Sequence, residues 1–186
     1  MEIFEKPKER NLFLSQEVNQ ESINRLTKSI IEINEDDERI EKIYKFNDLQ
    51  YSPKPIKIYI DSYGGLVYQC LGLLGVMRNS KTPIHTIVTG CAMSCGFLIS
   101  ISGNKRFGYS KSTYLYHQVS SASWGSLKEM EEKVIETKRL QEIIESITLE
   151  KTKITKKQLE KAYREKLDWY IDTEEALNLG VIDEIL

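Results

Sequence analysis

Ser94 has the surroundings of a nucleophile in acyl transfer. It lies in the run Gly90-Cys91-Ala92-Met93-Ser94-Cys95-Gly96, after an apolar segment with the pattern of a strand and before one with the pattern of a helix. This run resembles a G-x-S-x-G elbow with Ala92 at its first position, a turn that exposes the serine hydroxyl. The helix N-terminus favours the negative charge that develops during attack. A serine that only caps the helix is the alternative interpretation.

A serine hydroxyl needs a base to take its proton, and the chain holds only two histidines. His117 ends a predicted strand and precedes small polar residues, so we expect it at a cleft, whereas His85 lies inside a strand and is expected to pack or cap. A carboxylate must then orient the imidazole. Asp168 is the candidate because it precedes the apolar run Trp169-Tyr170-Ile171, although a solvated loop acid explains it equally well.

Gly64 and Gly65 come between a predicted strand and a predicted helix. Such a pair lets backbone N–H groups approach an anion closely, although a tight turn without a ligand is the commoner use. Neither G-x-x-x-x-G-K-[ST] nor G-x-G-x-x-G is present, which disfavours a phosphate loop. Cys95 is a weak candidate nucleophile, because one position along a helix turns its side chain about 100° away from Ser94.

The elements that carry these residues alternate between strand and helix, which predicts an α/β fold with a largely parallel sheet and helices on its faces. We expect strands at 11–14, 56–60, 83–88, 113–117 and 181–182, and a turn at Gly90. We expect helices from Asn19 to an extended end within 34–55, and at 66–77, 94–102 and 126–152. Capping patterns at Thr155 and Asp172 predict two further short helices, the second ending at Gly180.

The predicted helix 126–152 is roughly 40 Å long, more than the core of one small domain needs. We therefore expect it to pack against another copy of the chain.

Composition excludes several classes of function. The chain has 186 residues with 26 Lys+Arg and 28 Asp+Glu, a net charge of −2, which argues against a nucleic-acid footprint or a polybasic membrane patch. The uncharged stretch 82–104 is interrupted by Pro83, Gly90 and Gly96, so it predicts a strand, a turn and a helix rather than a membrane span. Three cysteines without a C-x-x-C pair, two histidines and a charged N-terminus predict a cytoplasmic protein without a metal site.

Four ordered segments resemble the Clp peptidase family: KIYIDSYGG (57–65), TGCAMSCGFLIS (89–100), YLYHQ (114–118) and DWYIDTEEALNLGVIDEIL (168–186). The similarity extends from about Asn11 to the C-terminus. It implies a crotonase-like α/β fold of repeated ββα-type units in a single domain, 1–186. The head would comprise 11–125 and 164–186, and the handle helix region 126–163.

The resemblance implies a self-compartmentalised serine endopeptidase without a cofactor. The family's triad falls on Ser94 as nucleophile, His117 as base and Asp168 as orienting acid, and its oxyanion hole falls on the backbone N–H groups of Gly65 and Cys95. It further implies a homo-oligomer of heptameric rings stacked to a tetradecamer. Its substrates would be unfolded polypeptides, and its partner an AAA+ unfoldase.

The chain departs from the family at several places, which is typical of a divergent member. Asp61 and Tyr63 stand where the family usually has Asn and Pro, and the link 34–55 is longer than usual. About ten residues precede the first strand and the sequence ends at Leu186, so we expect a truncated axial loop and no C-terminal tail of the usual kind. The alternatives are a catalytically silent scaffold subunit of a mixed ring and a crotonase-type acyl-CoA enzyme, which shares the fold.

Overall fold

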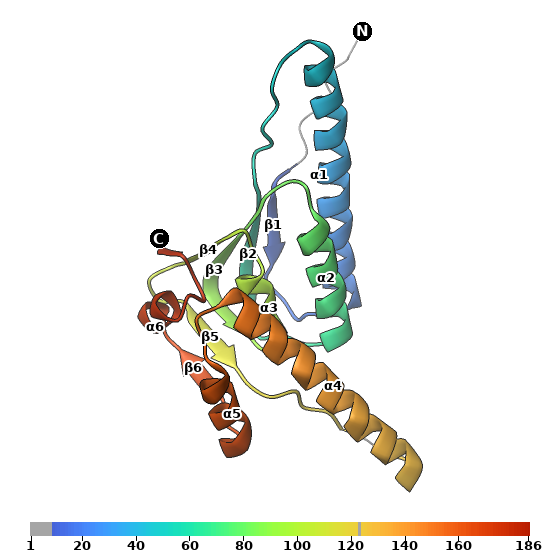
Figure 1. Ribbon diagram of the computed structural model, residues 1–186, viewed down its shortest axis with the longest axis vertical. Helices are drawn as coiled ribbons and strands as arrows, with labels where there is room; N and C mark the ends of the chain where they lie inside the picture. Colours follow the sequence, from blue (N-terminus) through green and yellow to red (C-terminus); the bar gives the residue numbers. More distant parts are fainter. Residues whose placement is uncertain (1–8, 123) are drawn as a thin grey trace.

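A largely parallel sheet forms the centre of the computed structural model, which describes residues 9–122 and 124–186 (Figure 1). The strands β1-β2-β3-β4-β7 lie side by side in parallel, while β5 pairs in parallel with β3 and antiparallel with β6. The strands are β1 (Asn11–Leu14), β2 (Ile56–Ser62), β3 (Ile84–Met93), β4 (Lys105–Gly108), β5 (Thr113–Tyr116), β6 (Trp169–Ile171) and β7 (Glu184–Ile185). The predicted α/β class is confirmed.

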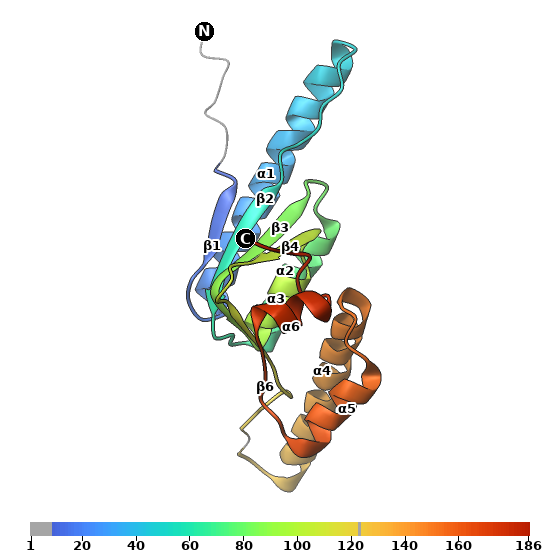
Figure 2. The ribbon, with the colours of Figure 1, turned by 90° about the vertical axis from the view of Figure 1, so that its left-hand side faces the viewer.

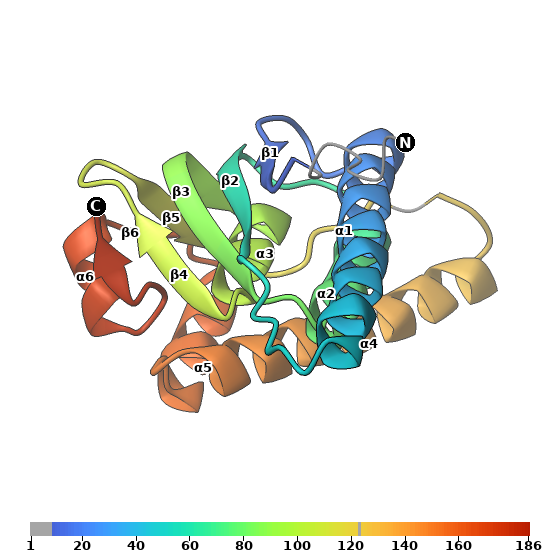
Figure 3. The ribbon, with the colours of Figure 1, turned by 90° about the horizontal axis from the view of Figure 1, so that it is seen from above.

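Helix α2 packs between α1 and α3, α1 and α3 also pack on strands of the sheet, and α4 packs on α3 (Figure 3). The helices are α1 (Gln20–Phe46), α2 (Val67–Asn79), α3 (Cys95–Ile101), α4 (Leu127–Lys151), α5 (Lys156–Glu165) and α6 (Thr173–Asn178). Residues of β2 alternate between buried and more exposed positions. At this strand the helices therefore cover one face of the sheet rather than both.

Side-chain caps set the starts of α1, α4, α5 and α6, and those at Asn19, Thr155 and Asp172 were predicted from the sequence. Asn19, Ser126 and Thr155 each accept a hydrogen bond from the third helical residue in a reciprocal capping box. Asp172 accepts the N–H of Glu175 at the start of α6, and Gly180 adopts a left-handed backbone just after that helix.

Strand β3 is longer than predicted and continues through Gly90, where we expected a turn, to Met93. A Cβ on Gly90 would lie 2.5 Å from a carboxylate oxygen of Asp61, so this glycine permits a close approach within the sheet. The same carboxylate accepts the N–H of Cys91 at 3.0 Å. The last three residues of β3 then pair with β5. The turn falls at Ser94 instead.

The C-terminal strand is also displaced from its predicted place. Val181 and Ile182 are buried core residues, and β7 is the pair that follows Asp183. Asp183 begins the pairing with β4, because its N–H donates to the carbonyl of Arg106 at 2.8 Å and its carboxylate accepts the Arg106 guanidinium. Strands β4 and β6 were not predicted, since each is too short to show an alternating pattern.

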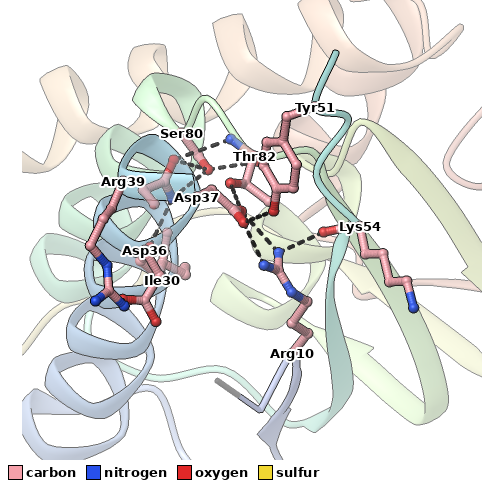
Figure 4. Close-up of polar contacts among 10 residues, drawn as sticks. Arg10, Ile30, Asp36, Asp37, Arg39, Tyr51, Lys54, Ser80 and Thr82 are labelled. Carbon is pink, nitrogen blue, oxygen red and sulfur yellow. Dashed lines mark hydrogen bonds and ion pairs between the residues drawn. The ribbon is translucent and has the colours of Figure 1, made fainter. Parts of the chain in front are cut away.

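Helix α1 continues to Phe46, beyond the sheet, so its outer end projects from the body opposite α4 and α5 (Figure 2). The carboxylate of Asp37 fixes this extension (Figure 4). It accepts hydrogen bonds from Arg10 at 2.5 and 2.9 Å, from Thr82 at 2.5 Å and from the Tyr51 hydroxyl. These bonds join α1 to the chain before β1, to the returning segment 47–55 and to the turn before β3.

In the part of the chain that the structure describes, no helix is long and apolar enough to cross a membrane. The uncharged stretch 82–104 forms β3, the turn at Ser94 and α3. The same described residues hold no group of three metal-ligating side chains. The three cysteines are free and buried.

Candidate active site

Ser94 occupies the sharp turn between β3 and α3. Its backbone has φ 53° and ψ −119°, a left-handed conformation that strains any residue with a side chain. The surrounding chain holds it there, since its N–H donates to the carbonyl of Leu115 at 3.0 Å and its carbonyl accepts the N–H of Leu98 at 3.2 Å. The side chain makes no capping hydrogen bond to α3. The capping interpretation is therefore wrong, and the hydroxyl is presented at the turn.

Two glycines make room for this turn. A Cβ on Gly64 would lie 2.7 Å from both the Met93 carbonyl oxygen and the Ser94 Cβ. A Cβ on Gly96 would lie 2.9 Å from the carbonyl oxygen of Ser62. The end of β2 and the start of α3 are therefore in direct backbone contact, and a side chain at either glycine would push the serine out of place.

Within the described residues 9–122 and 124–186, the backbone N–H of Gly65 has no hydrogen-bond acceptor, because its neighbours make the bonds to Val18. The carbonyl of Gly64 accepts the N–H of Val18 and the N–H of Leu66 donates to the carbonyl of Val18, both at 2.7 Å. Gly65 and Val18 thus form a parallel β-bridge, in which the N–H of Gly65 points away from Val18. The carbonyl of Gly65 accepts the Cys95 thiol at 3.3 Å, which brings Gly65 against the start of α3.

The second predicted oxyanion donor is the N–H of Cys95. It is the first N–H of α3, so no carbonyl within the helix can accept it. The site where a Cβ of Gly64 would stand is 3.0 Å from this nitrogen. Both predicted donors, Gly65 and Cys95, thus lie beside the Ser94 turn.

His117 follows β5 directly and is half-buried. Because β5 pairs with the last residues of β3, the histidine is brought to the elbow. Ser94 and His117 line one small cavity of about 20 Å³. The rest of its lining is Val67, Cys95, Phe97, Leu98, Tyr116 and Ile144. His85 instead lies in β3 with its ring 5.8 Å from that of Phe107, and burial lowers its pKa.

The pairing of β5 with β6 positions Asp168, which immediately precedes β6. Tyr116 pairs with Trp169, so the next position of this antiparallel register sets Asp168 opposite His117. The aspartate is exposed and not sheltered by the apolar run after it. Trp169 turns its indole N–H to Glu175 at 3.3 Å, and Tyr170 is itself exposed.

Among the residues that the structure describes, no hydrogen bond joins the side chains of Ser94, His117 and Asp168 to one another. The strand pairing therefore brings Ser94 and His117 to one cavity and sets Asp168 on the strand segment beside His117, while the three side chains are not linked to one another in the single chain. Loose catalytic hydrogen bonds are common in proteins without substrate.

Cys95 does not compete with Ser94 as nucleophile. Its side chain is only 1% exposed and its thiol donates to the Gly65 carbonyl, so it faces the protein interior. The Cys70 thiol donates to the carbonyl of Cys95 at 3.5 Å, and hydrogen bonding with Cys95 together with burial raises the pKa of Cys70.

Asp61 is a residue whose part in the site the sequence reasoning missed. Its carboxylate holds the N–H of Cys91 and packs on Gly90, which fixes the strand that leads to Ser94. The signal in the sequence was that Asp61 stands where the Clp peptidase family usually has Asn.

A strained serine at a strand-to-helix turn, the backbone N–H groups of Gly65 and Cys95 beside it and a histidine at the same cavity are the features that a serine-type hydrolase needs. Comparison with known proteins agrees. The family model described as Clp protease matches residues 2–186. An ATP-dependent Clp protease proteolytic subunit of Deinococcus radiodurans is 32% identical over 142 residues, which are 75% of this chain and 68% of that protein.

Two further relatives carry similar names. The ATP-dependent Clp protease proteolytic subunit of Streptococcus mutans is 33% identical over 148 residues, 76% of this chain and 73% of that protein. The ATP-dependent Clp protease proteolytic subunit 2 of Treponema pallidum is 29% identical over 150 residues, 79% of this chain and 73% of that protein. The chain belongs to the Clp protease family and is a serine-type peptidase.

Proposed function

We propose that this chain is the proteolytic subunit of a self-compartmentalised endopeptidase that cuts unfolded polypeptides into short peptides. Ser94 is the nucleophile, His117 the base and later the acid, and Asp168 the residue that orients the imidazole. The observation that carries the proposal is the left-handed backbone of Ser94 with an uncapped hydroxyl, because such strain persists only where the surroundings enforce it.

The reaction is acyl transfer in two steps. The Ser94 oxygen attacks the peptide carbonyl while His117 takes its proton, and the amides of Gly65 and Cys95 hold the oxyanion. The imidazolium then gives the proton to the leaving amine, and the peptide bond breaks. In the second step a water molecule attacks the acyl-enzyme while His117 takes its proton, and the peptide is released as a carboxylic acid while Ser94 regains its hydroxyl. No cofactor is required by this chemistry.

The assembly we propose is a homo-oligomer of two stacked heptameric rings that encloses the active sites, with a head of 11–125 and 164–186 and a handle of 126–163. Support comes from the outer half of α4, whose large apolar side chains are exposed on a single chain. They are Leu127, Met130, Val134 and Ile135. Apolar surface of this extent along one helix calls for a protein partner. We place the assembly in the cytoplasm, with an AAA+ unfoldase that supplies substrate.

One observation favours a second candidate, a catalytically silent scaffold subunit. In the described part of the chain the three candidate side chains are not hydrogen-bonded to one another. A silent subunit would assemble but would not hydrolyse peptides.

The test is size fractionation of the purified chain with hydrolysis of a fluorogenic peptide and an unfolded protein measured in each fraction. We expect activity only in ring-sized particles, and its loss by orders of magnitude in Ser94→Ala and in His117→Ala. The double variant should be no worse than either single one, because the two residues act as a unit. Ring-sized wild-type particles without activity would overturn the proposal in favour of the scaffold.

A further inference from the structure

Gln141 on α4 contacts the chain on both sides of His117. Its Oε1 accepts the N–H of Val119 at 2.8 Å, and its Nε2 donates to the hydroxyl of Tyr116 at 3.3 Å. Tyr116 comes immediately before the histidine and Val119 two residues after it. The glutamine is buried, at 7% exposed, which is uncommon for an amide side chain unless it is well bonded.

Glu145 sets the orientation of this amide. Its carboxylate accepts a second hydrogen bond from the Gln141 Nε2 at 2.8 Å. The two amide hydrogens are thus directed at Tyr116 and Glu145, and the amide oxygen at Val119. A flipped amide would set its NH₂ against the N–H of Val119, so only one orientation satisfies all partners.

The base itself has no comparable anchor. In the described residues no hydrogen bond links the imidazole of His117 to Ser94 or Asp168. Where the imidazole lies therefore depends on the backbone of segment 116–119. Tyr116 is also packed edge-on against Phe97, with ring centroids 6.0 Å apart, so the segment is held from α3 and from α4.

We infer that Gln141 is a positioning residue that fixes segment 116–119, and through it His117, relative to α4. This inference rests on the proposed function. Helix α4 then has two roles, contact with a second copy of the chain and placement of His117. The outer half of the helix has exposed apolar side chains that a second copy of the chain would cover, and Gln141 lies on its buried inner half.

Three variants test this role. Gln141→Leu keeps the side-chain volume but removes all three hydrogen bonds, to Val119, Tyr116 and Glu145. The pair Gln141→Glu with Glu145→Gln exchanges amide and carboxylate, so an oxygen still faces Val119 and the net charge is unchanged. Glu142→Leu is the control, because Glu142 is exposed and adjacent on the same helix. For each we would measure particle mass, kcat, KM and the amide hydrogen exchange of residues 116–121.

We expect Gln141→Leu to lower kcat about 10- to 100-fold with little change in KM, as misplacement of a catalytic group does. Exchange at 116–121 should be faster in the same variant. The exchanged pair should recover kcat to within about threefold of wild type, and the control should match wild type.

Unchanged kcat in Gln141→Leu, despite faster exchange, would overturn the inference. If Gln141→Leu does not fold, the exchanged pair decides: activity near that of wild type supports the role, and particles of normal mass with low kcat contradict it. A wild-type chain that assembles but hydrolyses nothing would refute the proposed function and this role together. If amide hydrogen exchange at 116–121 were nevertheless faster in Gln141→Leu than in this inactive wild type, the contacts of Gln141 would be purely structural.

Discussion

At the scale of single residues, the site depends on unusual backbone conformations at Ser94 and Gly65, and the conformation of Gly65 leaves no room for a side chain. Ser94 adopts a left-handed conformation and Gly65 has φ 147°. A Cβ on Gly65 would lie 2.3 Å from the carbonyl oxygen of Val18. A side chain there would force the bridge to Val18 apart and carry the Gly65 N–H away from the oxyanion.

We therefore expect Gly65→Ala to lower kcat by a factor of about 10² to 10³, the loss that follows removal of one oxyanion donor. Steady-state hydrolysis of a short fluorogenic peptide measures this. Gly72→Ala is the matched control, because nothing lies within 4 Å of its Cβ position on α2, and it should be as active as wild type. Equal activity of the two variants would remove Gly65 from the oxyanion hole.

Single residues were predicted from the sequence to different degrees. Ser94 and His117 were identifiable, because the glycine-flanked elbow is a local pattern and only two histidines compete. Gln141 was not, since its role depends on a contact with Val119 far from it in the sequence. The exposure of Asp168 was missed because the indole of the adjacent Trp169 turns toward Glu175, which no local pattern shows.

At the scale of elements, the buried carboxylate of Asp37 links α1 to three other segments of the chain through Arg10, Tyr51 and Thr82. Burial alone would raise the pKa of Asp37, but hydrogen bonds from Arg10, Thr82 and Tyr51 outweigh it and hold that pKa below its ordinary value. Burial, and then the neighbouring Asp37, raise the pKa of Tyr51 to about 12, so its hydroxyl remains a donor at neutral pH.

We expect Asp37→Asn to destabilise the fold by about 2–3 kcal/mol, because the partly buried Arg10 guanidinium loses its counter-ion. Denaturant unfolding measures this. Since the folded pKa is lowered, the carboxylate stabilises the fold above its unfolded pKa, and this contribution is lost as the pH falls below about 4. The difference between wild type and variant should therefore shrink on acidification.

The control for this prediction is Asp36→Asn. Asp36 is the neighbouring carboxylate and pairs at 3.2 Å with Arg39, within the same helix and near its surface. We expect it to cost less than about 1 kcal/mol, as surface ion pairs do. Equal losses in the two variants would show that the buried cluster has no special part in holding α1.

The elements themselves were largely predictable where local rules apply. The predicted caps at Asn19 and Thr155 set the starts of α1 and α5, and each is confirmed by a reciprocal hydrogen bond. The errors arose from tertiary contacts. Gly90 resembled a turn residue, but it allows the close approach of Asp61 within β3. The last strand starts after Asp183 because that residue pairs with Arg106 of β4.

At the scale of the whole molecule, α1 and α4 project at opposite ends of the sheet (Figure 2). The site lies between them, at the junction of β3, β5 and α3. Three segments that are remote in the sequence, carrying Ser94, His117 and Asp168, meet there because β5 pairs with both β3 and β6. An activated serine at position 94 requires this topology.

The most direct measurement of this claim is the mass of the intact chain after treatment with a fluorophosphonate, which modifies only activated serines. We expect one adduct per chain, located on Ser94, with none in Ser94→Ala and much slower labelling in His117→Ala and in Asp168→Asn. Labelling at the same rate in wild type and in all three variants would show that Ser94 is not an activated nucleophile.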